Sequence, residues 1–328
     1  MSAQRAAGTA GSFDRGHEAV NRLQSAVEDV LRGKSDQVRL ALSCLVAGGH
    51  LLIEDNPGTG KTSLAKAIAG AVGGVARRVQ FTPDLLPSDI TGITIFNPAT
   101  GTFTFREGPT FTNILVADEI NRASPKTQAA LLEVMEERQV TTDGVTRRVP
   151  EPFMVVATQN PLDFQGTYPL PEVQLDRFAM KLTLGYAPRE SELEIMARGR
   201  RPDAPVVVES VLTISQFNEL TGVADDVAVA APLREYIADI IGATRTHQDL
   251  RLGVSTRGAL TLIGIGRAYA LACGRPFVTP DDIKLLAVPV LAHRMAVTSE
   301  AEIDGVTEVS VIESILSTLP VPRHRESP

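Results

Sequence analysis

The sequence feature that most constrains the fold is a glycine-containing turn between an apolar run and a helical pattern. Residues 51–66 read LLIEDNPGTGKTSLAK. The apolar run can form a buried strand that ends at Glu54, and apolar residues recur at helical spacing after Lys61. A strand, a glycine-bearing turn and a helix in this order are the architecture of a phosphate-binding loop.

The residue types in this turn suit a bound triphosphate. Gly58 and Gly60 allow successive backbone N–H groups to face anionic oxygens, because no Cβ stands in the way. Lys61 can reach the β and γ phosphates, and the hydroxyl of Thr62 can ligate Mg²⁺ at the positive end of the helix. The expected nucleotide-binding residues are Asn56, Pro57, Gly58, Thr59, Gly60, Lys61, Thr62 and Ser63.

One position of the turn departs from the full pattern. The pattern G-x-x-x-x-G-K-[ST] has glycine where this chain has Asp55. An ordinary strand-to-helix turn can have a similar sequence, so the assignment depends on partner residues further along the chain.

A carboxylate pair provides the first such partner. The apolar run 113–117 leads directly into Asp118 and Glu119. Asp118 is expected to hold Mg²⁺ through its water shell, and Glu119 to orient and deprotonate the attacking water. The alternative, an exposed acidic strand end, loses weight because a phosphate-binding turn precedes this strand.

A second apolar strand, predicted over residues 153–158, ends in Gln159-Asn160-Pro161. The amide of Asn160 could bond the γ-phosphate or the water between that phosphate and Glu119. Asn-Pro also starts many ordinary turns, so a structural role for Asn160 stays open.

Strand and helix patterns alternate in the first half of the chain, and helical patterns dominate from Ser215 onward. This order predicts an α/β nucleotide domain followed by an α-helical lid. The Ala-, Gly- and Ser-rich N-terminus has no apolar periodicity and is expected to be disordered. The expected boundaries are a disordered tail at 1–12, the nucleotide domain at 13–187, a linker at 188–208, the lid at 209–320 and a tail at 321–328.

Two β-hairpins are predicted within the nucleotide domain. In the first, apolar residues of 93–96 face Phe103 and Phe105 across a flexible tip, which could be plain structural decoration. The second, within residues 139–149, turns at Asp143-Gly144, a strong hairpin signal.

Composition narrows the class of protein. A net charge of −7 disfavours non-specific binding to nucleic acid, because phosphate backbones demand a basic surface. Two cysteines among 328 residues point to a reducing compartment without a disulfide framework. The sequence shows neither a signal-peptide pattern nor an apolar run of bilayer length, so we expect a cytoplasmic protein.

Several motifs in order carry a resemblance to a known family. They are the turn at 57–62, DEINRA at 118–123, Asn160-Pro161, LPEVQLDRF at 170–178, QFTPDLLPSD at 80–89 and STRGAL at 255–260. Together they resemble the MoxR family of AAA+ ATPases, over residues 30–297. The resemblance implies an αβα sandwich with a parallel sheet, an all-α lid, and hydrolysis of ATP with Mg²⁺.

The resemblance also implies roles for individual residues. Lys61 and Thr62 become the phosphate and Mg²⁺ residues, Asp118 and Glu119 the second nucleotide motif, and Asn160 the first sensor. Gly33 falls where the family's chain passes close to the adenine, although it could equally serve only as a helix stop.

Two arginines gain roles in the same way. Arg177 resembles the finger that enters a neighbour's nucleotide site, and Arg257 resembles the sensor arginine of the lid. Arg177 could instead pair locally with Asp176 or Glu172, and Arg257 could be a surface cation on the first turn of a helix. Arg122 could line a subunit interface or pair with a nearby acidic residue.

These expectations favour a Mg-ATP hydrolase that acts as a chaperone-like machine. The resemblance implies a homo-oligomeric ring, with a hexamer as the expected size, and a protein client that bears a von Willebrand factor A domain. A nucleic-acid motor is one alternative, because Arg138, Arg147 and Arg148 flank the second hairpin. An ATP-gated scaffold is the other, although a scaffold has no need for the base Glu119.

Overall fold

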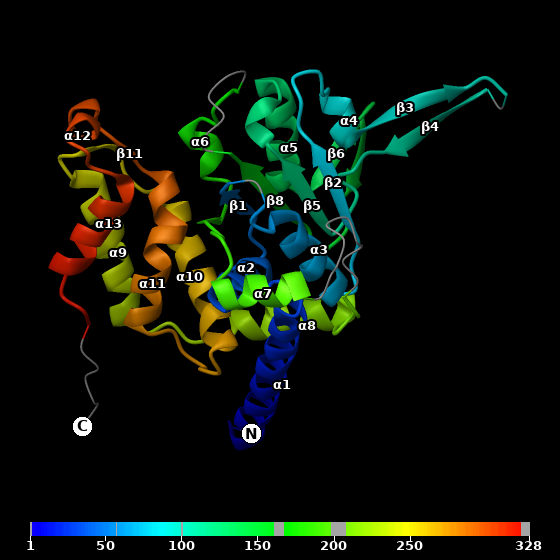
Figure 1. Cartoon of the computed structure of the whole chain (residues 1–328). Helices are drawn as coiled ribbons and strands as arrows, with labels where there is room; N and C mark the ends of the chain where they lie inside the picture. The colour runs from blue at the N-terminus through cyan, green and yellow to red at the C-terminus, as the bar shows by residue number, and fades with distance from the viewer. Residues whose placement is uncertain (1, 57, 100, 161–166, 198–207, 323–328) are drawn as a thin grey trace.

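A five-stranded parallel sheet forms the centre of the first domain (Figure 1). The computed structural model describes residues 2–56, 58–99, 101–160, 167–197 and 208–322. Within the sheet the strands lie in the order β2-β5-β8-β1-β9. Their bounds are Leu51–Glu54 (β1), Ala76–Gln80 (β2), Ile114–Asp118 (β5), Met154–Gln159 (β8) and Met180–Leu182 (β9).

Side chains alternate between the two faces of this sheet and enter two cores. On one face, Leu51 and Ile53 pack with helices α1, α2 and α3, whereas Leu52 on the other face packs with α4 and α5. Strands β1, β5 and β8 are covered on both faces and read as continuous apolar runs, which is why these three could be predicted. The helices run over Ser2–Glu28 (α1), Ser35–Val46 (α2), Lys61–Ala71 (α3), Pro87–Thr91 (α4) and Pro125–Glu137 (α5).

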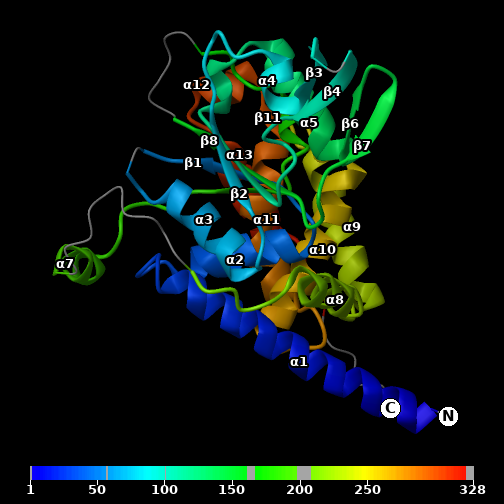
Figure 2. The ribbon, with the colours of Figure 1, turned by 90° about the vertical axis from the view of Figure 1, so that its right-hand side faces the viewer.

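The N-terminal segment differs from the prediction. Residues 2–12 lie in α1, which begins at Ser2, so the expectation of disorder over 1–12 is wrong for these described residues. The segment is rich in alanine, the strongest helix former, and it extends a helix that is already packed on the core at Val20 and Leu23. In Figure 2 this end of α1 projects away from the body of the molecule.

Both predicted hairpins are confirmed. Strands β3 (Gly92–Asn97) and β4 (Thr102–Glu107) form an antiparallel pair that projects from the domain (Figure 1). Strands β6 (Gln139–Thr142) and β7 (Val145–Arg148) turn at Asp143-Gly144, where both residues have positive φ. Each hairpin is a separate two-stranded sheet.

The second domain is helical, as predicted. The side chains of Thr213, Ser255 and Thr279 cap α8, α10 and α11 by accepting a backbone N–H, which accounts for where these helices begin. A short pair of strands, β10 (Leu250–Leu252) and β11 (Ala296–Val297), joins two of its loops. The helices are Ile214–Asp225 (α8), Ala231–Thr246 (α9), Thr256–Ala272 (α10), Pro280–Leu291 (α11), Ser299–Ile303 (α12) and Glu308–Thr318 (α13).

The lid packs directly on the first domain. One core contains residues of α1, α2 and α3 together with residues of α8, α9, α10, α11 and α13. His17 Nδ1 of α1 also lies 2.9 Å from the carbonyl oxygen of Leu271 in α10. This shared core fixes the lid beside α1 and α2.

The chain between the two domains contains a further helix. Helix α7 (Arg189–Ala197) occupies the first part of the predicted linker, and the rest of that linker, 198–207, lies outside the described residues. Short helical segments also occur at Ile120–Arg122 (η1), Glu172–Leu175 (α6) and Ala292–Arg294 (η2). No helix in the part of the chain that the structure describes has the length and apolarity to cross a membrane.

Candidate functional site

The parallel sheet brings the predicted phosphate loop and the carboxylate pair to one edge. Strand β8 lies between β1 and β5, and Leu52, Ala157 and Ala117 are in register across the three strands. Because all three strands run in the same direction, their carboxyl ends meet at this edge, with β1 and β5 roughly 10 Å apart. The loop after β1 and the residues after β5 therefore open toward the same space.

The turn after β1 has the backbone geometry of an anion-binding loop. Gly58 and Gly60 both have positive φ, +85° and +95°, and α3 begins immediately afterwards at Lys61. The first N–H groups of α3 have no partner within the helix, so they are available to an anion. Thr62 and Ser63 stand on this first turn, whereas Pro57 lies outside the described residues.

The lysine of the loop is turned back onto its own backbone. Lys61 Nζ donates to the carbonyl oxygens of Asp55 (2.6 Å) and Asn56 (3.0 Å). The hydroxyl of Thr59 also donates to Asn56 O, at 3.2 Å. A triphosphate would offer Lys61 a stronger, charged acceptor than these carbonyls.

The carboxylate pair is held by polar side chains from neighbouring strands. Arg78 Nε donates to Asp118, and the hydroxyl of Thr158 lies 3.3 Å from Asp118 Oδ1. The same hydroxyl accepts the N–H of Glu119 at 2.9 Å. Glu119 has φ +55°, a left-handed conformation that redirects its side chain as the chain leaves β5.

Two side chains hold the carboxylate of Glu119. Gln80 Nε2 donates to its Oε2 at 2.8 Å, and Arg122 Nε lies 3.2 Å from the same oxygen. The sequence left two alternatives for Arg122, a subunit interface or an ion pair with a nearby acidic residue, and this contact corresponds to the second. Sequence reasoning assigned no role to Gln80, Arg78 or Thr158. Gln80 begins the motif at 80–89, whereas the only signal for Arg78 and Thr158 was that each is a polar residue in a strand of the sheet.

Asn160 follows the last residue of β8, so it lies at the same edge as the loop and the acidic pair. Its side chain is half-buried. Pro161 and the rest of 161–166 lie outside the described residues.

A cavity of about 380 Å³ opens beside the phosphate loop. Gly58, Thr59, Gly60 and Ser63 form one side of it. Gly33 stands in the sequence between two residues that line the cavity, Arg32 and Lys34. It has φ +75°, and its Cα packs against Pro188 and Ser191. The remaining lining residues are Asp29, Val30, Leu31, Arg32, Lys34, Tyr186, Ala187, Glu192 and Met196.

Arg177 and Arg257 lie at the opposite edge of the sheet, the one formed by the amino ends of the strands. The carbonyl oxygen of His50, just before β1, accepts the N–H of Ala179, two residues after Arg177. Arg177 therefore stands at the amino ends of β1 and β9. Strand β1 has four residues, so roughly 13 Å of strand separates this edge from the phosphate loop.

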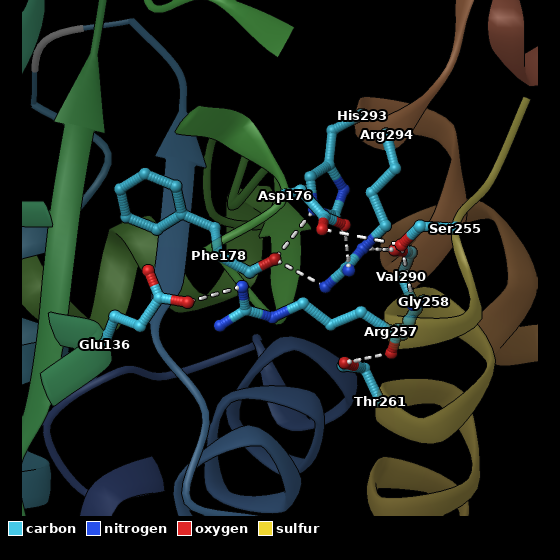
Figure 3. Close-up of polar contacts among 10 residues, drawn as sticks. All are labelled: Glu136, Asp176, Phe178, Ser255, Arg257, Gly258, Thr261, Val290, His293 and Arg294. Atoms are coloured by element: carbon cyan, nitrogen blue, oxygen red, sulfur yellow. Dashed lines mark hydrogen bonds and ion pairs between the residues drawn. The ribbon is translucent and has the colours of Figure 1, made fainter. Parts of the chain in front are cut away.

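Both arginines contact one carboxylate. Arg257 Nη1 lies 3.1 Å from Glu136 Oε1 (Figure 3). Arg177 Nη2 lies 3.0 Å from Glu136 Oε2. Arg177 thus pairs with Glu136. The two local acids predicted as alternatives, Asp176 and Glu172, pair with Arg294 and Arg251. Arg257 stands on the first turn of α10, and its ion pair with Glu136 joins the lid to the end of α5.

An ion pair between the buried Arg294 and the half-buried Asp176 lies beside this cluster. Arg294 Nη1 contacts Asp176 Oδ1 at 2.5 Å, and Arg294 Nη2 donates to Phe178 O at 2.8 Å. Burial lowers the pKa of Arg294, and Asp176 opposes that shift. Arg257, Arg177, Arg294 and Glu136 line a polar pocket of about 250 Å³. Glu136 and Arg294 had no motif to reveal them.

Comparison with known proteins places these features in a family. Residues 50–180 match the ATPase family associated with various cellular activities (AAA), and residues 242–315 match the AAA lid domain. A presumed ATPase from Cytophaga hutchinsonii, solved by crystallography, superposes with a TM-score of 0.89 at 35% identity, covering 97% of this chain and 99% of that one.

Curated relatives are similar over nearly their whole length. The uncharacterized protein YeaC of Bacillus subtilis is 44% identical over 95% of this chain and 97% of its own. The chaperone MoxR1 of Mycobacterium tuberculosis is 38% identical over 93% and 83%, and the protein MoxR of Paracoccus denitrificans is 30% identical over 93% and 97%. The parallel sheet with its glycine loop, the helical lid and these similarities together show that the chain belongs to the MoxR family of AAA+ ATPases.

Proposed function

We propose that the chain hydrolyses Mg-ATP as a homo-oligomeric ring. In this ring, arginines of the neighbouring subunit complete each nucleotide-binding site. The observation that carries this proposal is the position of Arg177 and Arg257 at the sheet edge opposite the phosphate loop. Neither arginine is at the edge where its own chain would hold a triphosphate. A second copy that presents this edge to the loop would supply both.

Within one subunit, the loop and α3 bind the phosphates. The backbone N–H groups at Gly58, Gly60 and the start of α3 surround the anionic oxygens, and Lys61 moves from its carbonyl contacts to the β and γ phosphates. Asn160 stands at the same edge and can bond the γ-phosphate or the attacking water.

Glu119 acts as the general base. Its contacts with Gln80 and Arg122 occupy one oxygen of the carboxylate, Oε2, in the present arrangement. Release of those contacts frees it to orient water and to accept its proton. The adjoining Asp118 remains tied to Thr158 and Arg78.

The donor set fits Mg²⁺. Thr62 offers a hydroxyl and Asp118 a carboxylate, both at the edge where the phosphates bind. Among the described residues there is no cluster of three or more His, Cys, Asp or Glu side chains that could hold a metal by itself. That suits Mg²⁺, which takes few protein ligands and completes its shell with phosphates and water. When bound, the ion neutralises charge on the β and γ phosphates.

Assembly is tested by the concentration dependence of hydrolysis. Activity per wild-type chain should rise with protein concentration, because separated subunits lack the neighbour's arginines. Arg177→Ala and Arg257→Ala should assemble as wild type does and hydrolyse ATP about 10³-fold more slowly. Arg148→Ala, an exposed arginine of the second hairpin, is the matched control and should retain activity. Concentration-independent activity, or full activity in both arginine variants, would contradict the proposal.

The client is proposed to be a protein with a von Willebrand factor A domain, remodelled or activated in a chaperone-like cycle. A relative named as a chaperone supports a protein client. Glu119→Gln held in ATP should retain the client in a pull-down that the Lys61→Ala variant, unable to bind ATP, does not reproduce. Capture of proteins without such a domain, equally by both variants, would remove this part of the proposal.

Contacts in the structure weaken the nucleic-acid alternative. Arg138 donates to the carbonyl oxygens of Gly48 and Phe153, and the guanidinium of Arg147 stacks over Phe105 at 4.0 Å from the ring centroid. Two of the three arginines that could touch phosphates are therefore engaged within the chain. Strong, salt-sensitive stimulation of hydrolysis by DNA would revive the alternative. A cytoplasmic location remains a prediction.

A further inference from the structure

We propose that Asp55 and Lys34 are positioning residues that set the separation between the phosphate loop and the opposite wall of the nucleotide cavity. This wall is the segment 185–196, which contributes Tyr186, Ala187, Glu192 and Met196 to the lining. The inference rests on the proposed function, because it assigns the cavity to a nucleoside triphosphate.

Asp55 ties the loop to this wall. It is buried, with 6% of its surface exposed, at the position where the usual loop pattern has glycine. Its Oδ2 accepts the N–H groups of Leu184 (2.9 Å) and Gly185 (2.7 Å), while its Oδ1 accepts the N–H of Asn56 (2.8 Å). One carboxylate thus fixes the first residue of the loop and the first residue of the wall.

Lys34 ties the same two segments from the other side. It is equally buried, and its Nζ donates to the carbonyl oxygens of Thr59 in the loop (2.9 Å) and Gly185 in the wall (2.5 Å). The N–H and the C=O of Gly185 are therefore both held, by an anion and by a cation. Burial lowers the pKa of Lys34, and the nearby charge of Asp55 opposes that shift.

A second contact holds the wall further along. A Cβ added at Gly33 would lie 2.5 Å from Ser191 Oγ and 2.7 Å from Pro188 Cδ, so only glycine allows this approach. The wall is thus attached at Gly185 and again at Pro188 and Ser191. The attachment at Gly185 is the one that also contacts the phosphate loop, through Asp55 and through Lys34 on Thr59.

This arrangement predicts different effects on two anions. ATP reaches from the phosphate loop to the far side of the cavity, so its affinity depends on the separation of loop and wall. Inorganic tripolyphosphate carries the same phosphate chain without a nucleoside, so it depends on the loop alone. A change in the separation should weaken ATP and spare tripolyphosphate.

The test is calorimetric binding of Mg-ATP and Mg-tripolyphosphate to the full chain and to two near-isosteric variants. Asp55→Asn keeps one acceptor oxygen and loses the charge, and Lys34→Met keeps the stem and loses the donor. The ATP affinity of each variant should fall by about 10-fold or more, because charge-assisted hydrogen bonds are lost. The affinity for tripolyphosphate should stay within about 3-fold of wild type. Lys34→Arg, which restores a charged donor, should recover part of the ATP affinity.

Matched controls change exposed residues of the same types. Lys66→Met on α3 and Asp225→Asn on α8 should leave both affinities unchanged. Steady-state kinetics adds a second readout: KM for ATP should rise in the Asp55 and Lys34 variants while kcat at saturating ATP stays within about 3-fold of wild type.

Each other outcome has a definite meaning. Equal weakening of ATP and tripolyphosphate would show that the two side chains only maintain the loop, and unchanged affinity for both would show that they position nothing; either result overturns this inference and leaves the proposed function standing. A wild-type chain that binds neither anion would overturn the proposed function and this inference with it.

Discussion

In the proposed function, Glu119 is the residue on which hydrolysis depends most directly. Its left-handed backbone and its contacts with Gln80 and Arg122 hold its carboxylate just beyond the carboxyl end of β5. Adjacent to it, Asp118 has different partners, Arg78 and Thr158. The two neighbouring carboxylates thus have different environments, which supports the different roles proposed for them.

The substitution Glu119→Gln should separate binding from chemistry. The amide keeps the shape of the side chain and cannot accept a proton from water, so we expect ATP affinity near that of wild type and a loss of about 10²-fold or more in turnover. Titration with a fluorescent ATP analogue and a phosphate-release assay measure the two quantities. Equal turnover in the variant and wild type would remove Glu119 from its role.

Two buried histidines should make stability depend on pH. Burial lowers the pKa of His50 and of His293 from the usual 6.5 to about 3. His50 is neutral in the fold because its Nδ1 accepts the N–H of Val155. Below pH 6.5 the histidines bind protons in the unfolded chain but not in the folded chain. Their contribution to the free energy of unfolding is therefore fully present above pH 6.5 and is lost as pH falls toward 3.

The expected slope can be measured by urea unfolding. Each histidine should cost about 1 kcal/mol of unfolding free energy between pH 6.5 and 5.5, and about 1.4 kcal/mol per unit below that, so the pair should cost about 2 kcal/mol over the first interval. His293→Gln should reduce that slope by about half. A wild-type stability that stays constant over this interval would show that neither ring is held neutral by the fold.

At the scale of elements, Gly33, in the turn after α1, packs against the start of α7. Gly33→Ala combines positive φ with a collision at Pro188 and Ser191, so we expect a loss of about 2 to 4 kcal/mol in stability or release of the wall with a raised KM for ATP. Gly305→Ala in the lid is the control: it has φ +77° and open space around the added Cβ, so it should cost only about 1 kcal/mol and leave KM unchanged.

Thermal unfolding and steady-state kinetics on both glycine variants separate the two effects. If Gly33→Ala behaves like Gly305→Ala in both assays, the contact with α7 has no energetic weight.

Elements with strong local signals could be predicted from the sequence. Strands β1, β5 and β8 are apolar runs buried on both faces, and the hairpin at Asp143-Gly144 has the turn chemistry that such hairpins require. Residues 2–12 could not, because composition alone does not show that a downstream packed helix will extend through an alanine-rich segment.

The candidate site was predictable only in part, for a related reason. The glycine loop and the acidic pair are local motifs, and a parallel sheet places their strands' carboxyl ends together. The partners of those motifs come from distant segments: Gln80 reaches Glu119, Glu136 reaches Arg177 and Arg257, and Lys34 reaches Gly185. The spacing of residues in the sequence does not predict such contacts, because they depend on how the elements pack.

At the scale of the whole molecule, nucleotide loop and arginines face different directions. The lid shares a core with α1 and α2 and presents Arg257 beside Arg177, so both domains contribute to the edge that would meet a neighbour. A single chain is therefore an incomplete ATPase in this account. Its site becomes complete only where the loop edge of one copy meets the arginine edge of the next.

Mixing two inactive variants tests this claim most directly. Lys61→Ala lacks ATP binding and keeps its arginines, whereas the double variant Arg177→Ala, Arg257→Ala keeps its loop and lacks them. We predict that each is inactive alone and that an equimolar mixture regains a measurable share of wild-type hydrolysis, since some interfaces then pair an intact loop with intact arginines. A mixture that forms mixed assemblies by size and mass and stays as inactive as its components would contradict the account.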